Sequence, residues 1–247
     1  SIKSLLGSNV GTGFYTSATT IARVPFFLLS ALATTLFPSI SFSTSKNDKA
    51  LTSRYITTSL RYMLILLVPI LFIVSSTSDS LVSLLYSSSY IEAGLPLSIL
   101  IFGLGFLAVF NVLSTIISAS GKPTISFSFV FALVFIDIIL NRILIPEYGL
   151  KGAAIATTFT MGIGLILASV YVYKKFKTLA DYKSFGKVIF ASLVVYMISC
   201  KISISGILLL FEYMVLFGVY LLILIVIKEL KKDDLKVLEQ ILPFNIR

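Results

Sequence analysis

The sequence predicts an all-α fold, a polytopic membrane helix bundle of about seven transmembrane helices, and three observations support this prediction. The chain is 57% hydrophobic and 13% charged, whereas about a quarter of the residues in soluble domains are charged. Its apolar residues gather in runs of about the 20 residues that a helix needs to cross a bilayer. Its lysines and arginines lie between these runs, mostly on one side.

Apolar spans follow one another along the chain, and prolines mark two of their ends. We expect the first span to end at Pro38 and the fourth to end at Pro146, because proline cannot continue the hydrogen-bond ladder of a helix. Pro25 and Pro69 fall inside spans, and proline is commoner in membrane helices than in soluble ones. The expected spans are residues 14–37, 56–74, 95–119, 125–145, 152–173, 188–204 and 207–227.

Two segments outside these spans are also partly apolar. Between the second and third spans, the stretch 81–86 is too short to cross a bilayer, so we expect a half-helix in the interface. After the seventh span, residues 228–247 place leucines at helical spacing among lysines and aspartates. This pattern predicts a cytoplasmic amphipathic tail that rests on the inner leaflet.

The basic residues fix the expected orientation. Fifteen of the 20 lysines and arginines follow the first, third, fifth and seventh spans, whereas three lie on the opposite side. Cytoplasmic connections carry the excess of basic residues, so we expect a multi-pass protein of the cell (plasma) membrane with an outside N-terminus and a cytoplasmic C-terminus. The odd number of spans and the first residue, a serine, indicate the C-terminal part of a longer protein.

The composition disfavours several kinds of chemistry. The chain has no histidine, the commonest metal ligand and general base, and Cys200 has no second cysteine to pair with. The net charge of +9 is explained by topology, because no basic stripe is interleaved with aromatic residues as in a nucleic-acid surface. We therefore expect no catalytic residue, no metal site, no cofactor and no nucleic-acid partner.

Three stretches of the sequence share their order and spacing with a known family. They are Gly-Phe-Tyr-Thr-Ser-Ala at 13–18 with Ile-Ala-Arg-Val-Pro at 21–25 and Leu-Phe-Pro-Ser-Ile at 36–40; Leu-Leu-Tyr at 84–86 with Tyr90, Ala93, Pro96 and Leu97; and Ala-Ser-Gly-Lys-Pro at 119–123 with Asn141 and Ile-Pro-Glu-Tyr-Gly-Leu-Lys-Gly-Ala-Ala-Ile-Ala-Thr at 145–157. Over residues 7–173 the chain resembles the second half of the polysaccharide (O-antigen type) flippases of the MATE-like (MOP) exporter superfamily. Residues 188–227 resemble, by position, the additional helix pair of fourteen-helix members.

The resemblance implies a transporter and not an enzyme. Members of the family have two six-helix lobes around a central cavity and alternate between inward-open and outward-open states. By this comparison residues 1–173 are most of the C-terminal lobe, residues 188–227 are the additional helix pair and residues 228–247 are the cytoplasmic tail. The N-terminal lobe and the first helix of the C-terminal lobe are missing from the chain.

The function implied by the resemblance is translocation of a lipid-linked oligosaccharide from the cytoplasmic to the outer leaflet, for the synthesis of cell-surface polysaccharide or glycoprotein. The implied partners are the lipid-linked glycan, membrane lipid and the missing N-terminal lobe. The chain departs from the family pattern at two positions. Ser87 stands where a glycine is common, and Asp137 stands where an uncharged residue is frequent.

Arg23 is a candidate for binding the substrate. It lies about 14 Å along the helix from Phe14 at 1.5 Å per residue, which is too deep for the side chain to reach the interface easily. A charge at such a depth costs several kcal/mol and is usually functional. Arg23 is expected either to meet the phosphate or pyrophosphate of the carrier lipid or to form a structural ion pair with a carboxylate such as Asp137.

Asp137, Asn141 and Asn111 are the other candidates. Asp137 lies in the middle of the fourth span, and Asn141 is four residues further on, so both face the same way. Asp137 is expected either to bind a coupling cation or proton or to be a neutral or arginine-paired structural residue, and Asn141 is expected to bind substrate. Asn111 is expected either to line the cavity or to bond to a neighbouring helix. Arg142 and Glu212 are expected to be structural.

Other function classes remain open from the sequence alone. A cation-coupled multidrug-type antiporter is favoured by Asp137 and disfavoured by Arg23. A polytopic membrane glycosyltransferase or polymerase would be expected to show clustered carboxylates, histidine or arginine in a large outer loop, whereas the outer acids here are isolated. A membrane scaffold is a further alternative, because half of the transporter is absent from the chain.

Overall fold

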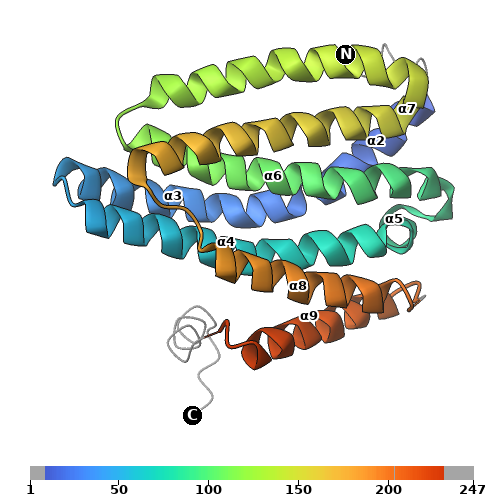
Figure 1. Ribbon diagram of the computed structural model, residues 1–247. Coiled ribbons are helices and arrows are strands. Elements are labelled where there is room, and N and C mark those ends of the chain that lie inside the picture. Colours follow the sequence, from blue (N-terminus) through green and yellow to red (C-terminus); the bar gives the residue numbers. More distant parts are fainter. Residues whose placement is uncertain (1–8, 203, 231–247) are drawn as a thin grey trace.

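The computed structural model describes residues 9–202 and 204–230, and this part of the chain is all-α (Figure 1). It contains eight α-helices and one short 3-10 helix, η1. The elements are α2 (Asn9–Ala22), α3 (Val24–Ser45), α4 (Lys49–Ser76), α5 (Ser78–Tyr86), η1 (Ser88–Ala93), α6 (Gly94–Ala119), α7 (Pro123–Phe176), α8 (Tyr182–Ser199) and α9 (Leu208–Val226). The predicted all-α fold is confirmed.

Five segments of the described chain are helical, long enough and apolar enough to cross a membrane: α3, α4, α6 together with η1, α7 and α9. The longest of them, α7, has 54 residues and consists of two arms, because Gly149 has a φ of +56° that no α-helix contains. Figure 1 shows the two arms running antiparallel, joined at the turn. The expected spans 125–145 and 152–173 correspond to these arms.

Two expected helix ends were placed wrongly at prolines. The first span does not end at Pro38, because α3 continues through this residue to Ser45. A proline inside a helix removes one backbone hydrogen bond, and the ladder can resume beyond it when neighbouring helices support the segment. The interruption lies instead at Arg23, just before Pro25, which occupies the first turn of α3. The expected span 14–37 is therefore divided between α2 and α3.

The end of the fourth span was also placed wrongly. Pro146 lies inside α7, and the chain turns three residues later at Gly149. Glycine adopts a positive φ without a steric penalty, so the chain turns at Gly149 and not at Pro146. Gly152 then brings the second arm close to the first, because a Cβ atom at this position would overlap the carbonyl oxygen of Leu144.

The segment between α4 and α6 is short and helical, as predicted. It contains α5 and η1, separated by Ser87 with a φ of +102°. This backbone region favours glycine, which accounts for the glycine common in the family at this position. The side chain of Ser87 accepts a hydrogen bond from the backbone N–H of Ser89 at 3.3 Å.

The centre of the bundle is α6, which packs most extensively on α7 and also on α3, α4 and α2. The helix pair α8 and α9 packs on α4 through a second apolar core (Figure 1). This core contains Ile65, Val68, Ile73, Val188, Ala191, Val195, Leu216, Tyr220 and Leu224. The expected amphipathic tail lies outside the described residues from position 231 onward.

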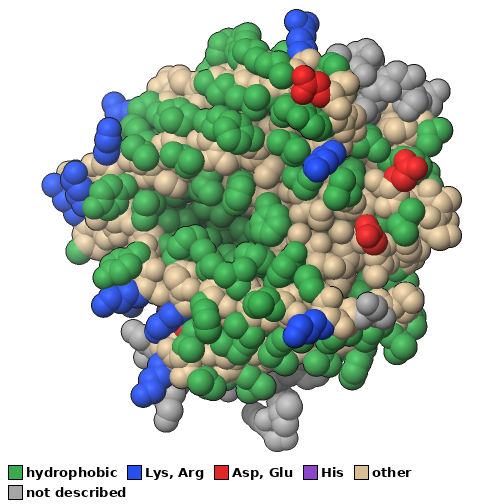
Figure 2. All heavy atoms as spheres, turned by 45° about the vertical axis from the view of Figure 1, so that its right-hand side comes forward, with side chains coloured by type: hydrophobic (Ala, Val, Ile, Leu, Met, Phe, Trp, Pro, Cys, Tyr) green, Lys and Arg blue, Asp and Glu red, His purple; other side chains and the backbone are tan. Residues whose placement is uncertain are grey.

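The connections of the bundle separate into two ends. The links between α3 and α4, between α6 and α7 and between α7 and α8 lie at the same end as the C-terminus of α9 (Figure 1). These are the lysine-rich connections of the sequence, and Figure 2 shows most basic side chains of the visible face gathered toward this end. We call it the basic end.

Candidate functional site

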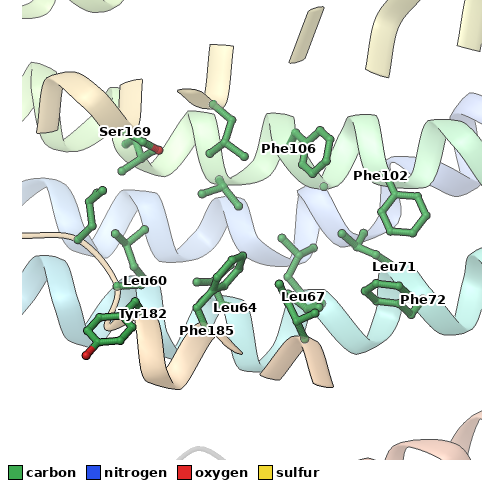
Figure 3. Close-up of a pocket in the computed structure, with 18 residues that line it drawn as sticks. Leu60, Leu64, Leu67, Leu71, Phe72, Phe102, Phe106, Ser169, Tyr182 and Phe185 are labelled. Carbon is green, nitrogen blue, oxygen red and sulfur yellow. The ribbon is translucent and has the colours of Figure 1, made fainter. Parts of the chain in front are cut away.

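An apolar groove of about 530 Å³ lies between α4, α6, the second arm of α7 and α8. It is visible as a hollow lined by hydrophobic side chains in Figure 2 and from close by in Figure 3. The lining residues are Leu60, Leu64, Leu67, Val68, Leu71, Phe72, Phe102, Gly105, Phe106, Val109, Leu113, Leu165, Ser169, Leu179, Ala180, Tyr182, Phe185 and Ile189. The groove suits a hydrocarbon chain and offers almost nothing to a charged group.

Aromatic side chains stand at both ends of this groove. Tyr182 and Phe185 of α8 lie at the basic end, and Phe72 and Phe102 lie at the other end (Figure 3). The rings of Phe72 and Phe102 meet edge to face with their centroids 5.4 Å apart. The groove therefore follows the direction of the helices, with α4, α6 and the second arm of α7 on one side and α8 on the other.

A polar pair lies in the first arm of α7. The side-chain amide of Asn141 donates to the main-chain oxygen of Asp137 at 2.8 Å and to its Oδ2 at 2.9 Å. The prediction that these two residues face the same way is confirmed. Oδ1 of Asp137 and Oδ1 of Asn141 are both buried without a hydrogen-bond partner among the described residues. Two buried oxygen acceptors are thus left for a cation, a proton or a donor from elsewhere.

A hydroxyl contact that sequence spacing did not reveal lies near this pair. The hydroxyl of Tyr15 in α2 meets Oγ1 of Thr157 in the second arm of α7 at 3.2 Å. Tyr15 lies within electrostatic range of both Asp137 and Arg23, and the Thr160 hydroxyl lies beside the Asp137 carboxyl group. Tyr15 belongs to the first motif stretch and Thr157 to the third. The one sequence signal that links the two residues is that both stretches are part of the same family pattern.

Arg23 lies at the interruption between α2 and α3, and its side chain is exposed. It forms no ion pair with any carboxylate of the described residues, Asp137 included, whose bonded partner is Asn141. The arrangement leaves the guanidinium group of Arg23 available to an anion. It does not contain the structural pair between Arg23 and Asp137 that the sequence left as an alternative.

The remaining candidates are dispersed. Asn111 is half-buried in α6, and its main-chain oxygen accepts from the Thr115 hydroxyl at 2.9 Å. Arg142 is exposed in the first arm of α7, near the turn at Gly149. Glu212 is 4% exposed and accepts from the Ser199 hydroxyl at 3.3 Å, with Oε2 unpartnered within the described chain. The structure thus brings Asp137 and Asn141 together and shows no bond from this pair to Asn111.

The described residues thus form an all-α bundle with helices of membrane-spanning length, a buried polar pair and a long apolar groove. No group of three or more acidic, histidine or cysteine side chains that could hold a metal occurs in residues 9–202 and 204–230. The family model described as lipid II flippase MurJ matches residues 5–228. The chain belongs to this flippase family, and the predicted membership of the superfamily is confirmed.

Individual relatives agree with this assignment. The chain is 25% identical over 182 residues to a protein of Haloferax volcanii named probable low-salt glycan biosynthesis flippase Agl15, and the match covers 74% of the chain and 39% of the relative. It is 29% identical over 189 residues to the probable flippase AglR of the same organism, with the same coverage of 74% and 39%. The match to the capsular polysaccharide biosynthesis protein CapF of Staphylococcus aureus is 37% identical over 97 residues and covers 39% of the chain and 24% of CapF.

A solved structure shows the same fold. The lipid II flippase MurJ in its inward closed conformation superposes with a TM-score of 0.74 at 20% sequence identity, over 86% of the chain and 46% of that protein. The chain therefore spans less than half the length of these relatives.

Proposed function

We propose that the protein to which this chain contributes moves a lipid-linked oligosaccharide from the cytoplasmic to the outer leaflet of the cell membrane. The product would serve the synthesis of cell-surface polysaccharide or glycoprotein. The observation that carries the proposal is the long apolar groove in a chain whose family model covers residues 5–228. A groove of this kind accommodates a lipid chain that must stay associated with the protein while its polar head crosses.

The proposed arrangement in the membrane has seven crossings. α2 and α3 form one crossing interrupted at Arg23, the two arms of α7 count as two, and α4, α6, α8 and α9 supply the rest. The basic end faces the cytoplasm because the connections there carry the lysines. α2 to α7 then make up most of a C-terminal lobe, α8 and α9 are an additional pair, and the partner is an N-terminal lobe outside this chain.

The groove supplies a path for the lipid and little specificity. Membrane lipid is as apolar as the groove lining, so a hydrocarbon tail gains little free energy by leaving one for the other. Recognition must therefore come from the polar head group. We assign Arg23 to a phosphate or pyrophosphate of the head group, because its exposed guanidinium group has no carboxylate partner among the described residues, and Asn111 and Asn141 to further polar contacts.

Asp137 is the proposed site of the coupling ion. Its Oδ1 and the Oδ1 of Asn141 are buried acceptors without a described partner, with the Thr160 hydroxyl nearby. Hard cations prefer oxygen ligands, and a proton on Asp137 would satisfy the same atoms. Binding of either would remove an uncompensated acceptor from the interior, which gives the ion a differential effect on conformations that expose or bury this pair.

A cation-coupled multidrug-type antiporter is the second candidate, and Asp137 is the observation that favours it. Such a protein needs a buried acid but no groove for a long chain. The two candidates differ in what fills the groove and are separated by the same experiment.

The experiment is reconstitution of the full-length protein in vesicles with a labelled lipid-linked glycan. Ser169→Phe places a ring in the groove and should reduce flipping by about tenfold or more, which corresponds to 1.4 kcal/mol or more. Val170→Phe is the matched control, because Val170 is the next residue of α7 and is exposed and outside the groove lining. No flipping by the wild-type protein, or equal flipping by both variants, would contradict the proposal.

A further inference from the structure

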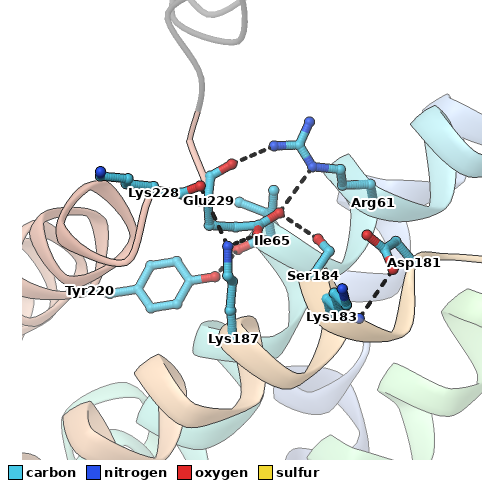
Figure 4. A network of polar contacts seen from close by, with 9 residues as sticks. All are labelled: Arg61, Ile65, Asp181, Lys183, Ser184, Lys187, Tyr220, Lys228 and Glu229. Atoms are coloured by element: carbon cyan, nitrogen blue, oxygen red, sulfur yellow. Dashed lines mark hydrogen bonds and ion pairs between the residues drawn. The ribbon is translucent and has the colours of Figure 1, made fainter.

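A cluster of charged and hydroxyl groups joins α4, α8 and the end of α9 at the basic end (Figure 4). Its centre is Glu229, three residues after the last residue of α9 and 6% exposed. Arg61 of α4 approaches Oε1 of Glu229 with its Nε at 3.1 Å, and Lys187 of α8 approaches Oε2 with its Nζ at 3.2 Å. The hydroxyl of Ser184, also in α8, donates to Oε1. We call these four residues the Glu229 latch.

The main chain takes part in the same cluster. Nη2 of Arg61 donates to the carbonyl oxygen of Glu229 at 2.6 Å, and Nζ of Lys187 donates to the carbonyl oxygen of Lys228 at 3.5 Å. Burial on its own raises the pKa of the Glu229 carboxyl group, but hydrogen bonds from Ser184, Arg61 and Lys187 outweigh it and hold the pKa below its ordinary value. The charged carboxylate of Glu229 therefore bonds both α4 and α8. Arg61 also holds the main chain of Glu229 on α4.

The Glu229 latch lies where α4 and α8 meet, beside the groove that both helices line. We call this contact between α4 and α8 the seam. In α4, Arg61 stands between Leu60 and Leu64, and both leucines line the groove. In α8, Ser184 is followed directly by Phe185, which also lines it. The same turns of α4 and α8 thus present charged or hydroxyl side chains to Glu229 and apolar side chains to the groove.

The opposite end of this seam is held by different groups. The Ser76 hydroxyl of α4 donates to Ser199 of α8 at 2.8 Å, and the Thr77 hydroxyl meets that of Tyr213 in α9 at 2.7 Å. None of these contacts involves Glu229. Loss of the Glu229 latch should therefore release the basic end of α8 while the other end stays attached.

We propose that Glu229 is a positioning residue that holds the basic end of α8 on α4 and so keeps the apolar groove formed. Its effect on transport rests on the proposed function, in which the groove accommodates the lipid chain. Its effect on the seam between α4 and α8 does not. Charge-assisted hydrogen bonds are about twice as strong as neutral ones, and this cluster concentrates them on one side chain.

The seam offers a matched pair of reporter positions. At the basic end, the hydroxyls of Thr57 in α4 and of Thr178 in the link that leads into α8 lie 2.9 Å apart, and at the other end the hydroxyls of Ser76 and Ser199 lie 2.8 Å apart. Cysteines at either pair are close enough to form a disulfide bond. The exposed Cys200 is first replaced by serine in the full-length protein.

With the Thr57→Cys/Thr178→Cys pair, Glu229→Gln should slow disulfide formation about tenfold, the effect of losing a charge-assisted hydrogen bond. With the Ser76→Cys/Ser199→Cys pair, the rate should be unchanged. Flipping by Glu229→Gln should fall and should recover once the Thr57→Cys/Thr178→Cys disulfide has formed. Recovery by a covalent substitute is a result that a general loss of folding cannot give.

The possible outcomes separate the two proposals. An unchanged rate at the basic end, or equal slowing at both ends, overturns the latch. The expected pattern of rates in a protein that does not flip the glycan upholds the latch and overturns the proposed function. If Glu229→Gln fails to accumulate in membranes, Lys187→Gln is compared with Lys183→Gln, whose side chain faces the Tyr182 ring. Lys187→Gln alone should then slow the basic-end reaction, and equal rates for the two variants overturn the latch.

Discussion

Arg23 interrupts the proposed first crossing at the point where α2 gives way to α3, and it forms no ion pair with a carboxylate of the described residues. A guanidinium group without a partner in a membrane-spanning region is costly. This cost is offset if an anionic ligand meets the guanidinium group during part of the cycle. The exposed position favours the role in substrate binding over the structural role.

Substitution of Arg23 in the full-length protein tests this role. Arg23→Ala should weaken binding of the lipid-linked glycan by about ten- to hundredfold, since a charge-assisted hydrogen bond contributes about 1.5–3 kcal/mol. Arg23→Lys should retain part of the affinity, because it keeps the charge but not the bidentate fork. The amount of protein in the membrane should not fall, because removing a charge eases insertion.

The control for Arg23 is Arg142→Ala, which removes an exposed arginine in the first arm of α7, near the turn at Gly149. It should leave binding of the glycan unchanged. Equal binding by Arg23→Ala and the wild-type protein, measured with the labelled glycan, would rule out phosphate recognition by Arg23.

Sequence spacing reveals contacts within an element and misses those between elements. Asp137 and Asn141 are four residues apart on one helix, so their shared face follows from helical geometry. The Tyr15–Thr157 contact joins residues 142 apart, and the Arg61–Glu229 pair joins residues 168 apart. Such contacts depend on how the helices pack. For this reason Glu229, the most extensively bonded acid described here, was not a candidate from the sequence.

At the scale of helices, hydropathy predicts which segments are helical better than where they end. The apolar spans correspond to helices, but Pro38 and Pro146 are not helix ends. A local rule treats proline as a stop, whereas packing by neighbouring helices lets α3 continue. The turn lies at Gly149, where glycine adopts a positive φ without the steric penalty that other residues meet.

Close packing of α6 on the second arm of α7 depends on Gly103. A Cβ atom at this position would lie 2.6 Å from Oγ1 and 2.8 Å from Cα of Thr158, a backbone atom that cannot move aside. Gly103→Ala should therefore lower the stability of the full-length protein by about 1–3 kcal/mol, the usual cost of overpacking. Gly162→Ala is the control, because its nearest neighbour is the Phe106 ring at 3.7 Å, an ordinary contact.

Thermal unfolding in detergent measures both variants. Alanine is favoured over glycine in a helix by up to about 1 kcal/mol, so Gly162→Ala should keep or raise the unfolding temperature while Gly103→Ala lowers it. The same sign for both variants would show that contact with Thr158 does not limit the approach of these helices.

At the scale of the whole molecule, the lysine-rich connections meet at one end of the bundle although they are far apart in the sequence (Figure 1). A reporter fused after Arg247 should therefore read as cytoplasmic, and a reporter inserted near Ser88, at the opposite end, should read as external. Accessibility to a membrane-impermeant reagent gives an independent measure. The reverse reading at either position would overturn the proposed orientation and with it the assignment of the seven crossings.

The chain by itself should not transport the glycan. It spans 46% of the solved flippase it resembles and 39% of AglR, and in the proposed function the head group crosses through a cavity between two lobes. Purified as the 247-residue chain and reconstituted with labelled lipid-linked glycan, it should give no flipping above that of protein-free vesicles. Co-reconstitution with the N-terminal remainder of the full-length protein should restore flipping, because the two lobes then enclose the head group. Flipping by the isolated chain in a monomeric state, established by its mass in detergent, would show that the groove and the Asp137–Asn141 pair suffice without a second lobe.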